Sequence, residues 1–165
     1  MKKILPGFTL IELLVVIAIM GVLATVGINT FPGALAKARD SQRIDDGRKI
    51  VAALQQFYTD KNRYAGQTGD IGSQCTSWCN SIAGATWIGG LSSYLPGSAV
   101  PTDPKNTEPY YYQYISDGQD YCLEIRLERE VPATDRNYHS SGSSGGKNFW
   151  KLHFGPSGAK SDLCT

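Results

Sequence analysis

The feature that most constrains this chain is a long uncharged stretch near its N-terminus. Residues 13–36 contain no Asp, Glu, Lys or Arg and are mostly aliphatic. As an α-helix they would extend over roughly 36 Å at about 1.5 Å per residue, whereas the hydrocarbon core of a membrane is about 30 Å thick. Lys2 and Lys3 precede the stretch, which predicts a cytoplasmic N-terminus, a single membrane span and an exported remainder.

The rest of the chain is polar and its charges are balanced. The 165 residues carry a formal net charge of +1, and 19% of them are charged. This balance does not favour a surface that follows a phosphate backbone, so we predict no specific nucleic-acid site. All four cysteines lie beyond residue 74, which predicts an oxidising compartment for the C-terminal part.

Glu12 lies within the apolar sequence that begins at Phe8. A charge at the centre of a membrane helix costs about 2.5–3.5 kcal/mol on insertion scales, and less near the interface, so Glu12 needs a partner or a function. A cut between Gly7 and Phe8 would create an amine close to it. The alternative is that Glu12 reaches the interface and has no such partner.

The sequence GFTLIELLVVIAIMGVLA, residues 7–24, resembles the class III signal of type IV pilins and type II secretion pseudopilins. The resemblance implies that prepilin peptidase removes residues 1–7 after Gly7 and that the amine of Phe8 is methylated. It also implies that Glu12 meets the Phe8 amine of a neighbouring subunit and sets the register of a filament. An inner-membrane assembly platform would be a further partner.

The N-terminal helix is expected in two parts: a transmembrane and assembly part over residues 8–32 and an amphipathic part over residues 33–64. Gly21, Gly27 and Pro32 either let the first part loosen when subunits pack or are ordinary helix residues with a kink. In the second part an apolar stripe predicts a face for a globular partner. The stripe consists of Ile44, Gly47, Val51, Leu54 and Tyr58, widened by Ile50 and Phe57.

Charged residues of both signs occupy the other side of the amphipathic part, between Arg39 and Lys49. Such residues are usually a solvated face, and Asp45 and Lys49 are spaced for an i,i+4 pair. Pairing between subunits of a filament is the alternative.

Residues 65–165 are expected to form a loop-rich headgroup with a small antiparallel sheet, so the fold class is α+β. Strands are predicted over residues 109–115, 121–128 (half-buried) and 148–154, with a hairpin turn at 116–119, a helical turn at 88–94 and a mobile loop at 138–146. The sheet would cover the apolar stripe of the helix.

The four cysteines allow three disulfide connectivities. A local Cys75–Cys79 loop is feasible, and Cys122 and Cys164 would then join a strand to the C-terminal segment. This second pair resembles the C-terminal disulfide loop of type IV pilins. A zinc site is the less favoured alternative, because an exported headgroup favours oxidation.

No motif for catalysis or for a resident cofactor is evident, and we expect no enzyme activity and no metal. Major pseudopilins often bind calcium in a C-terminal loop, but the corresponding residues 155–162 offer one carboxylate and a lysine, which is a poor calcium site. Both histidines are expected at the surface.

The sequence therefore predicts a filament subunit, and a major pilin is the favoured kind. The subunit would first be anchored in the inner membrane and would then enter an extracellular or periplasmic filament. The alternatives are a major pseudopilin and a minor pilin that acts as a tip adhesin.

Overall fold

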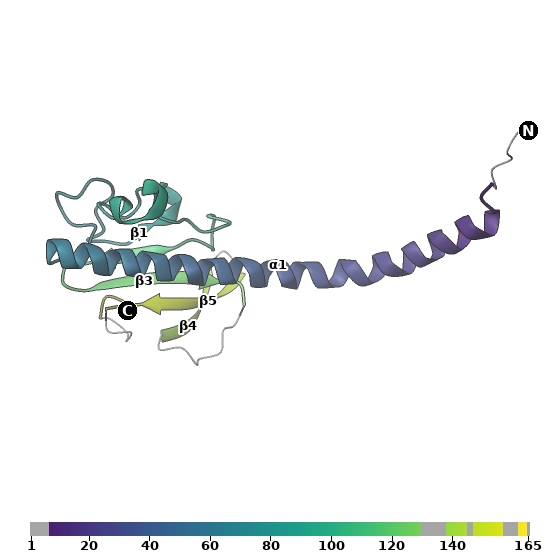
Figure 1. The fold of residues 1–165 in the computed structure, drawn as a ribbon. Coiled ribbons are helices and arrows are strands. Elements are labelled where there is room, and N and C mark those ends of the chain that lie inside the picture. The colour runs from purple at the N-terminus through teal and green to yellow at the C-terminus, as the bar shows by residue number, and fades with distance from the viewer. Residues whose placement is uncertain (1–6, 130–137, 145–146, 157–161, 165) are drawn as a thin grey trace, which may run out of the picture. The chain divides into compact units, whose positions relative to one another are not determined.

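The computed structural model describes residues 7–129, 138–144, 147–156 and 162–164. The chain divides into two compact units, residues 1–36 and residues 37–165. Helix α1, Leu10–Lys61, contributes residues to both units. Figure 1 shows that within the second unit α1 lies across a sheet.

Helix α1 begins two residues after the start and ends three residues before the end of the helix expected over residues 8–64. It ends where Asn62 takes a positive φ of 52° and its N–H donates to the carbonyl of Tyr58 over 2.8 Å, a left-handed conformation typical of a helix C-terminus. Gly21, Gly27 and Pro32 all lie inside α1, so no helix boundary separates residues 8–32 from residues 33–64. Their role as points of flexibility stays a prediction.

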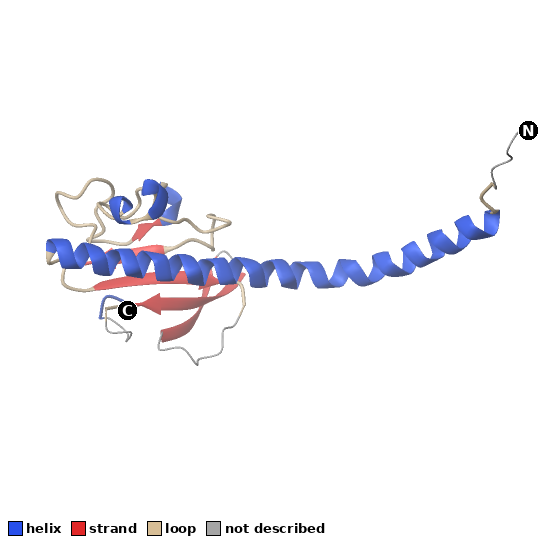
Figure 2. Ribbon diagram, viewed as in Figure 1, coloured by secondary structure: helices blue, strands red, loops and turns tan. Residues whose placement is uncertain are grey.

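The sheet is antiparallel and has the strand order β1-β2-β3-β5-β4 (Figure 2). The β2–β3 connection confirms the predicted hairpin: Ser116 pairs with Tyr121, and Asp117 Oδ1 accepts hydrogen bonds from the backbone of Gln119 and Asp120. The strands are β1 (Cys79–Asn80), β2 (Gln113–Ser116), β3 (Tyr121–Leu127), β4 (Tyr138–Ser144) and β5 (Lys147–Phe154).

The described part of the second unit also contains four single turns of 3-10 helix. One of them, η2, lies within the predicted helical turn at 88–94. They are η1 (Ser81–Ala83), η2 (Ser92–Tyr94), η3 (Pro96–Ser98) and η4 (Asp162–Cys164).

We call the second unit the head. Its hydrophobic core forms between the C-terminal half of α1 and the sheet, as predicted. Ile50, Leu54 and Phe57 of the apolar stripe are buried in one hydrophobic core that also includes residues of β3 and β5. At Gly47 helix α1 lies close to the sheet, because a Cβ there would meet the side chains of Ile125 and Phe154. Other members of this core are Trp87, Ile88, Leu91, Tyr112, Tyr114, Tyr121, Leu123, Leu127 and Leu152.

The prediction of a mobile loop over residues 138–146 is wrong for residues 138–144. Tyr138–Ser144 is strand β4, paired in continuous antiparallel register with β5. Its Ser- and Gly-rich sequence has no apolar alternation to reveal a strand. The backbone pairs with β5 supply the hydrogen bonds that the strand needs, and an edge position tolerates small side chains.

The prediction that β3 is half-buried is also wrong, because all seven of its residues are buried. On one face Cys122 is covered by η4 through a disulfide. The guanidinium of Arg126 lies 4.1 Å from the ring centre of Tyr111 and its Nε donates to Glu124. Polar residues of β3 are therefore buried in pairs, which an alternating sequence cannot distinguish from exposure.

Candidate functional site

The start of α1 is organised by a reciprocal pair of hydrogen bonds between Thr9 and Glu12. The Thr9 N–H donates to Glu12 Oε2 over 2.9 Å, and the Glu12 N–H donates to Thr9 Oγ1 over 3.4 Å. The Thr9 hydroxyl also donates to Glu12 Oε2, over 2.8 Å. This is a capping box, which satisfies backbone donors that a helix N-terminus otherwise leaves without partners.

The capping box gives Glu12 hydrogen-bond partners within its own chain, which we did not predict from the sequence. Thr9 is the residue that the sequence reasoning missed, although the spacing Thr-x-x-Glu before an apolar run signals this motif. The hydrogen bonds do not neutralise the negative charge of Glu12, and residues 8–36 contain no Lys, Arg or His. Within this stretch, the only cation that could pair with Glu12 is the amine that a cut before Phe8 would create.

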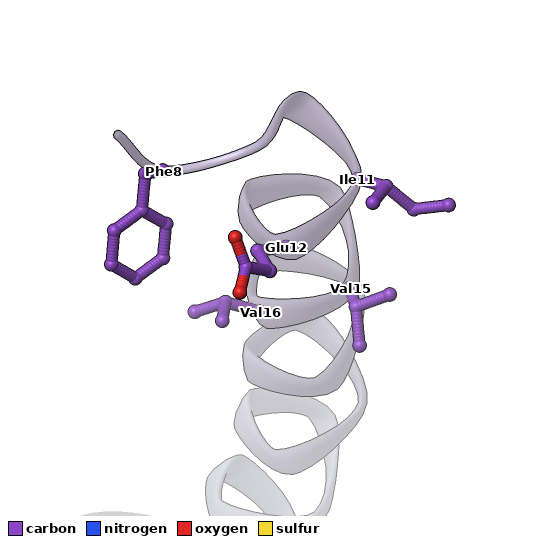
Figure 3. A pocket seen from close by; sticks show the side chains of 5 residues that line it. All are labelled: Phe8, Ile11, Glu12, Val15 and Val16. Carbon is purple, nitrogen blue, oxygen red and sulfur yellow. The ribbon is translucent and has the colours of Figure 1, made fainter. Parts of the chain in front are cut away.

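An exposed apolar surface surrounds this carboxylate. Phe8 is 83% exposed and Leu10 is 88% exposed. A shallow pocket of about 380 Å³ is lined by Phe8, Ile11, Glu12, Val15 and Val16. Figure 3 shows the carboxylate of Glu12 on the same side of the helix axis as the side chains of Phe8 and Val16, with Phe8 on the segment that precedes the helix. Such a surface requires an apolar partner, either lipid or protein.

Gly7 and Phe8 precede the helix and are both exposed. Cleavage between them and methylation of the Phe8 amine stay predictions. Within the described residues, no helix combines the length and the apolar character that a membrane crossing needs.

The head contains a second polar site that the sequence did not predict, in which Arg43 is completely buried. Its Nε and Nη2 donate to the two carboxylate oxygens of Asp103 over 2.7 and 3.1 Å. Its Nη1 donates to Asp40 and to Glu128, over 2.8 Å in each case. Arg39 and Lys105 also donate to Glu128. We call these six residues, three cations and three carboxylates, the ion cluster.

The ion cluster corrects the interpretation of the charged side of α1. Asp40, Arg43 and Asp46 are buried in the head and are therefore neither a solvated face nor available to another subunit. Lys49 pairs with Asp46 over 3.0 Å rather than with Asp45. Arg48 and Asp45 remain exposed.

Burial and hydrogen bonding act in opposite directions on the groups of the ion cluster. Burial by itself raises the pKa of Glu128, but hydrogen bonds from Arg39, Lys105 and Arg43 lower the pKa to about 2. Burial by itself lowers the pKa of Arg43, whereas its bonds to Asp103, Glu128 and Asp40 raise the pKa above its ordinary value. Both groups therefore stay charged at neutral pH, and the cluster holds α1 to the end of β3.

The two predicted disulfides are confirmed as Cys75–Cys79 and Cys122–Cys164. The expectation that both histidines lie at the surface is wrong for His153, which is buried beside Cys122. The side chain of His139 lies outside the described residues, as do residues 157–161 of the segment 155–162, for which we expect no calcium.

Comparison with known proteins relates this chain to type IV pilins, fimbrial proteins and a type II secretion core protein. Residues 6–28 match the family described as the prokaryotic N-terminal methylation motif. The type IV major pilin protein PilA of Myxococcus xanthus is 36% identical over 66 residues, 40% of this chain and 30% of that protein.

Two further relatives align over most of their length. The type II secretion system core protein G of Klebsiella michiganensis is 30% identical over 78% of this chain and 87% of that protein. The type IV major fimbrial protein FimA of Dichelobacter nodosus is 33% identical over 91% of this chain and 84% of that protein. No solved structure gives a significant match.

Proposed function

This chain belongs to the family of type IV pilins and type II secretion pseudopilins. We propose that it is a structural subunit of a type IV pilus-like filament and, within that class, a major pilin. Prepilin peptidase cuts after Gly7, the amine of Phe8 is methylated, and copies assemble through the apolar part of α1. The subunit is anchored in the inner membrane before it enters the filament. The role is structural and not enzymatic.

The observation that carries this proposal is the single charge of Glu12 within an exposed apolar surface. Inside a filament core, a carboxylate without a counter-ion would be strongly unfavourable. The amine of Phe8 in a neighbouring copy would supply the missing positive charge at one axial offset only. The hydrophobic contacts between helices tolerate many offsets, whereas this ion pair selects one.

The capping box adds a step to this assembly. Before assembly the Thr9 N–H and hydroxyl hold the Glu12 carboxylate against its own helix. The neighbouring amine then adds to a carboxylate that is already oriented, and a carboxylate accepts several hydrogen bonds at once.

A type II secretion major pseudopilin is the second candidate. It is supported by the core protein G relative, which aligns with 78% of this chain. The Cys122–Cys164 disulfide supports the pilin instead, because it resembles the C-terminal loop of type IV pilins.

The proposal is tested by separating the charge of Glu12 from its capping role. The variant Glu12→Gln keeps an oxygen that can accept from Thr9, since Gln also forms capping boxes, but carries no charge. We expect it to be inserted and cleaved normally and to be scarce in filaments sheared from the native host. The matched control Thr9→Ala loses the cap and keeps the charge, and it should still assemble.

Incorporation of Glu12→Gln at the wild-type level would refute the role of the charge. Deletion of the gene distinguishes the two candidates: loss of surface filaments supports the pilin, and loss of exported proteins with surface filaments intact supports the pseudopilin.

A further inference from the structure

Three side chains that can bind a metal meet on one face of the sheet. They are Cys122 of β3, His153 of β5 and Cys164 of η4, and their ligand atoms all lie within 4.8 Å of one another. All three residues are buried. Cys122 lies 31 residues before His153 and 42 residues before Cys164, so the pairing of β3 with β5 and the packing of η4 against β3 bring the three residues together.

We propose that the head holds a divalent metal ion of the zinc class on these three side chains when the Cys122–Cys164 disulfide is reduced. The disulfide and the metal use the same two sulfur atoms. They are therefore mutually exclusive states of one site. This proposal does not depend on the function proposed above.

The distances in the oxidised head already match part of a tetrahedral site. With zinc–sulfur and zinc–nitrogen bonds of about 2.3 and 2.0–2.1 Å, a tetrahedral angle places the sulfur and nitrogen about 3.5 Å apart. Cys122 Sγ lies 3.6 Å from His153 Nδ1. Two zinc-bound sulfurs lie about 3.8 Å apart, so metal binding requires the two cysteine sulfurs to separate. Cys164 is on a single helical turn, η4. A shift of this turn to separate the sulfurs disturbs less of the fold than a shift of strand β3 would.

The other nitrogen of His153 faces a carboxylate. His153 Nε2 lies 4.0 Å from Glu124 Oε2, and Glu124 pairs with His153 across β3 and β5. Arg126 and Lys151 hold the Glu124 carboxylate in place over 3.0 and 2.9 Å. A carboxylate on the far nitrogen of a histidine fixes the orientation of the ring toward a metal.

The charges of such a site suit its burial. A dithiol reductant supplies two electrons and two protons to the Cys122–Cys164 bond and closes to its own disulfide. The metal then displaces the two thiol protons to the solvent and forms two metal–sulfur bonds. Two thiolates, a neutral imidazole and a divalent ion sum to zero charge, which a buried site tolerates far better than a net charge.

The proposal is tested on the full-length chain in detergent. The variant carries Cys75→Ser and Cys79→Ser, is reduced with a dithiol that is then removed without air, and is titrated with Co²⁺. We expect one Co²⁺ per chain, with a thiolate-to-cobalt charge-transfer band and the visible bands of tetrahedral cobalt, both lost on adding Zn²⁺. The same sample kept oxidised should show neither band.

Matched variants identify the ligands. The chain with Cys122→Ser and Cys164→Ser, which keeps Cys75 and Cys79, should not give these bands. Glu124→Gln should lower the affinity roughly tenfold or more and keep the tetrahedral spectrum. Zn²⁺ should also slow the return of the disulfide in air.

The proposal is overturned if the reduced chain shows no stoichiometric cobalt bands, or if His153→Gln, folded by its tryptophan fluorescence, binds with unchanged affinity. The comparison of reduced and oxidised samples uses one sequence, so it remains decisive even if one of the ligand variants at Cys122, Cys164, Glu124 or His153 fails to fold.

Discussion

Replacing Arg43 by Gln should destabilise the head strongly, because it removes the centre of the ion cluster. The side chains of Arg43 and Asp103 are completely buried. In Arg43→Gln, Glu128 keeps Arg39 and Lys105, and Asp40 keeps the N–H groups of Glu128 and Arg129. Asp103 keeps the backbone N–H groups of Lys105 and Asn106 but loses its cation.

The magnitude follows from this uneven loss. Removing one partner of a buried ion pair costs about 3–5 kcal/mol, because it leaves a buried charge without compensation. The charge left behind belongs to Asp103, so the double variant with Asp103→Asn should be more stable than the sum of the two single effects by about 1–3 kcal/mol. The matched control is Arg48→Gln, which removes an exposed 3.4 Å pair with Asp45 and should change stability by less than about 1 kcal/mol.

The assay is urea unfolding of the full-length chain in detergent, followed by tryptophan fluorescence. Trp87 is completely buried and its indole N–H donates to the carbonyl of Pro101, so its emission reports the loss of the head core. The change should appear in the urea midpoint with the slope unchanged. A loss below 1 kcal/mol for Arg43→Gln, or additive effects in the double variant, would refute the argument that an unpaired Asp103 dominates.

Two other perturbations test the head. The pKa of Glu128 is lowered from 4.5 to about 2, so its stabilisation is complete above pH 4.5 and is lost as the pH falls toward 2. It amounts to at most about 3 kcal/mol, and acid unfolding of Glu128→Gln should lack this part of the pH dependence. Gly47→Ala should lower the free energy of unfolding by about 1–2 kcal/mol, because the added Cβ meets Phe154 Cε2 at 2.9 Å as well as Ile125 and this overpacking outweighs the gain in helix propensity. Its control Gly33→Ala, whose Cβ has nothing within 4 Å, keeps only the gain in helix propensity and should not lower the urea midpoint, and equal effects of the two would contradict this reasoning.

The elements set by a repeating pattern were predictable from the sequence. The apolar stripe that includes Ile50 and Leu54 repeats with the helical period, and the head buries that face of α1. The Ser116–Gln119 turn has strong local preferences, and the hairpin forms there. Both features depend on residues close together in the chain, where spacing and turn chemistry carry the information.

The features that we did not predict correctly depend on partners that are distant in the sequence. Arg43 and Arg48 both lie among charged residues of the same helix, so the local sequence does not distinguish them. Arg43 is buried because Asp103 and Glu128 approach it, whereas Arg48 is exposed. Strand β4 has no side-chain pattern of its own and exists through its pairing with β5. Thr9 is different, because its spacing to Glu12 was visible in the sequence.

In the proposed assembly the N-terminal helix moves from a bilayer to a filament core. Most of the free-energy difference between these two states should come from Glu12. Lipid tails are as apolar as leucine, so side chains such as Leu13 and Ile17 gain little hydrophobic free energy when they leave lipid for other helices. A carboxylate in the apolar region is unfavourable, by up to about 2.5–3.5 kcal/mol at mid-depth, and an amine from a neighbouring copy relieves this only in the filament. Removing one apolar side chain would therefore affect both states alike. Neutralising Glu12 would stabilise the membrane state alone.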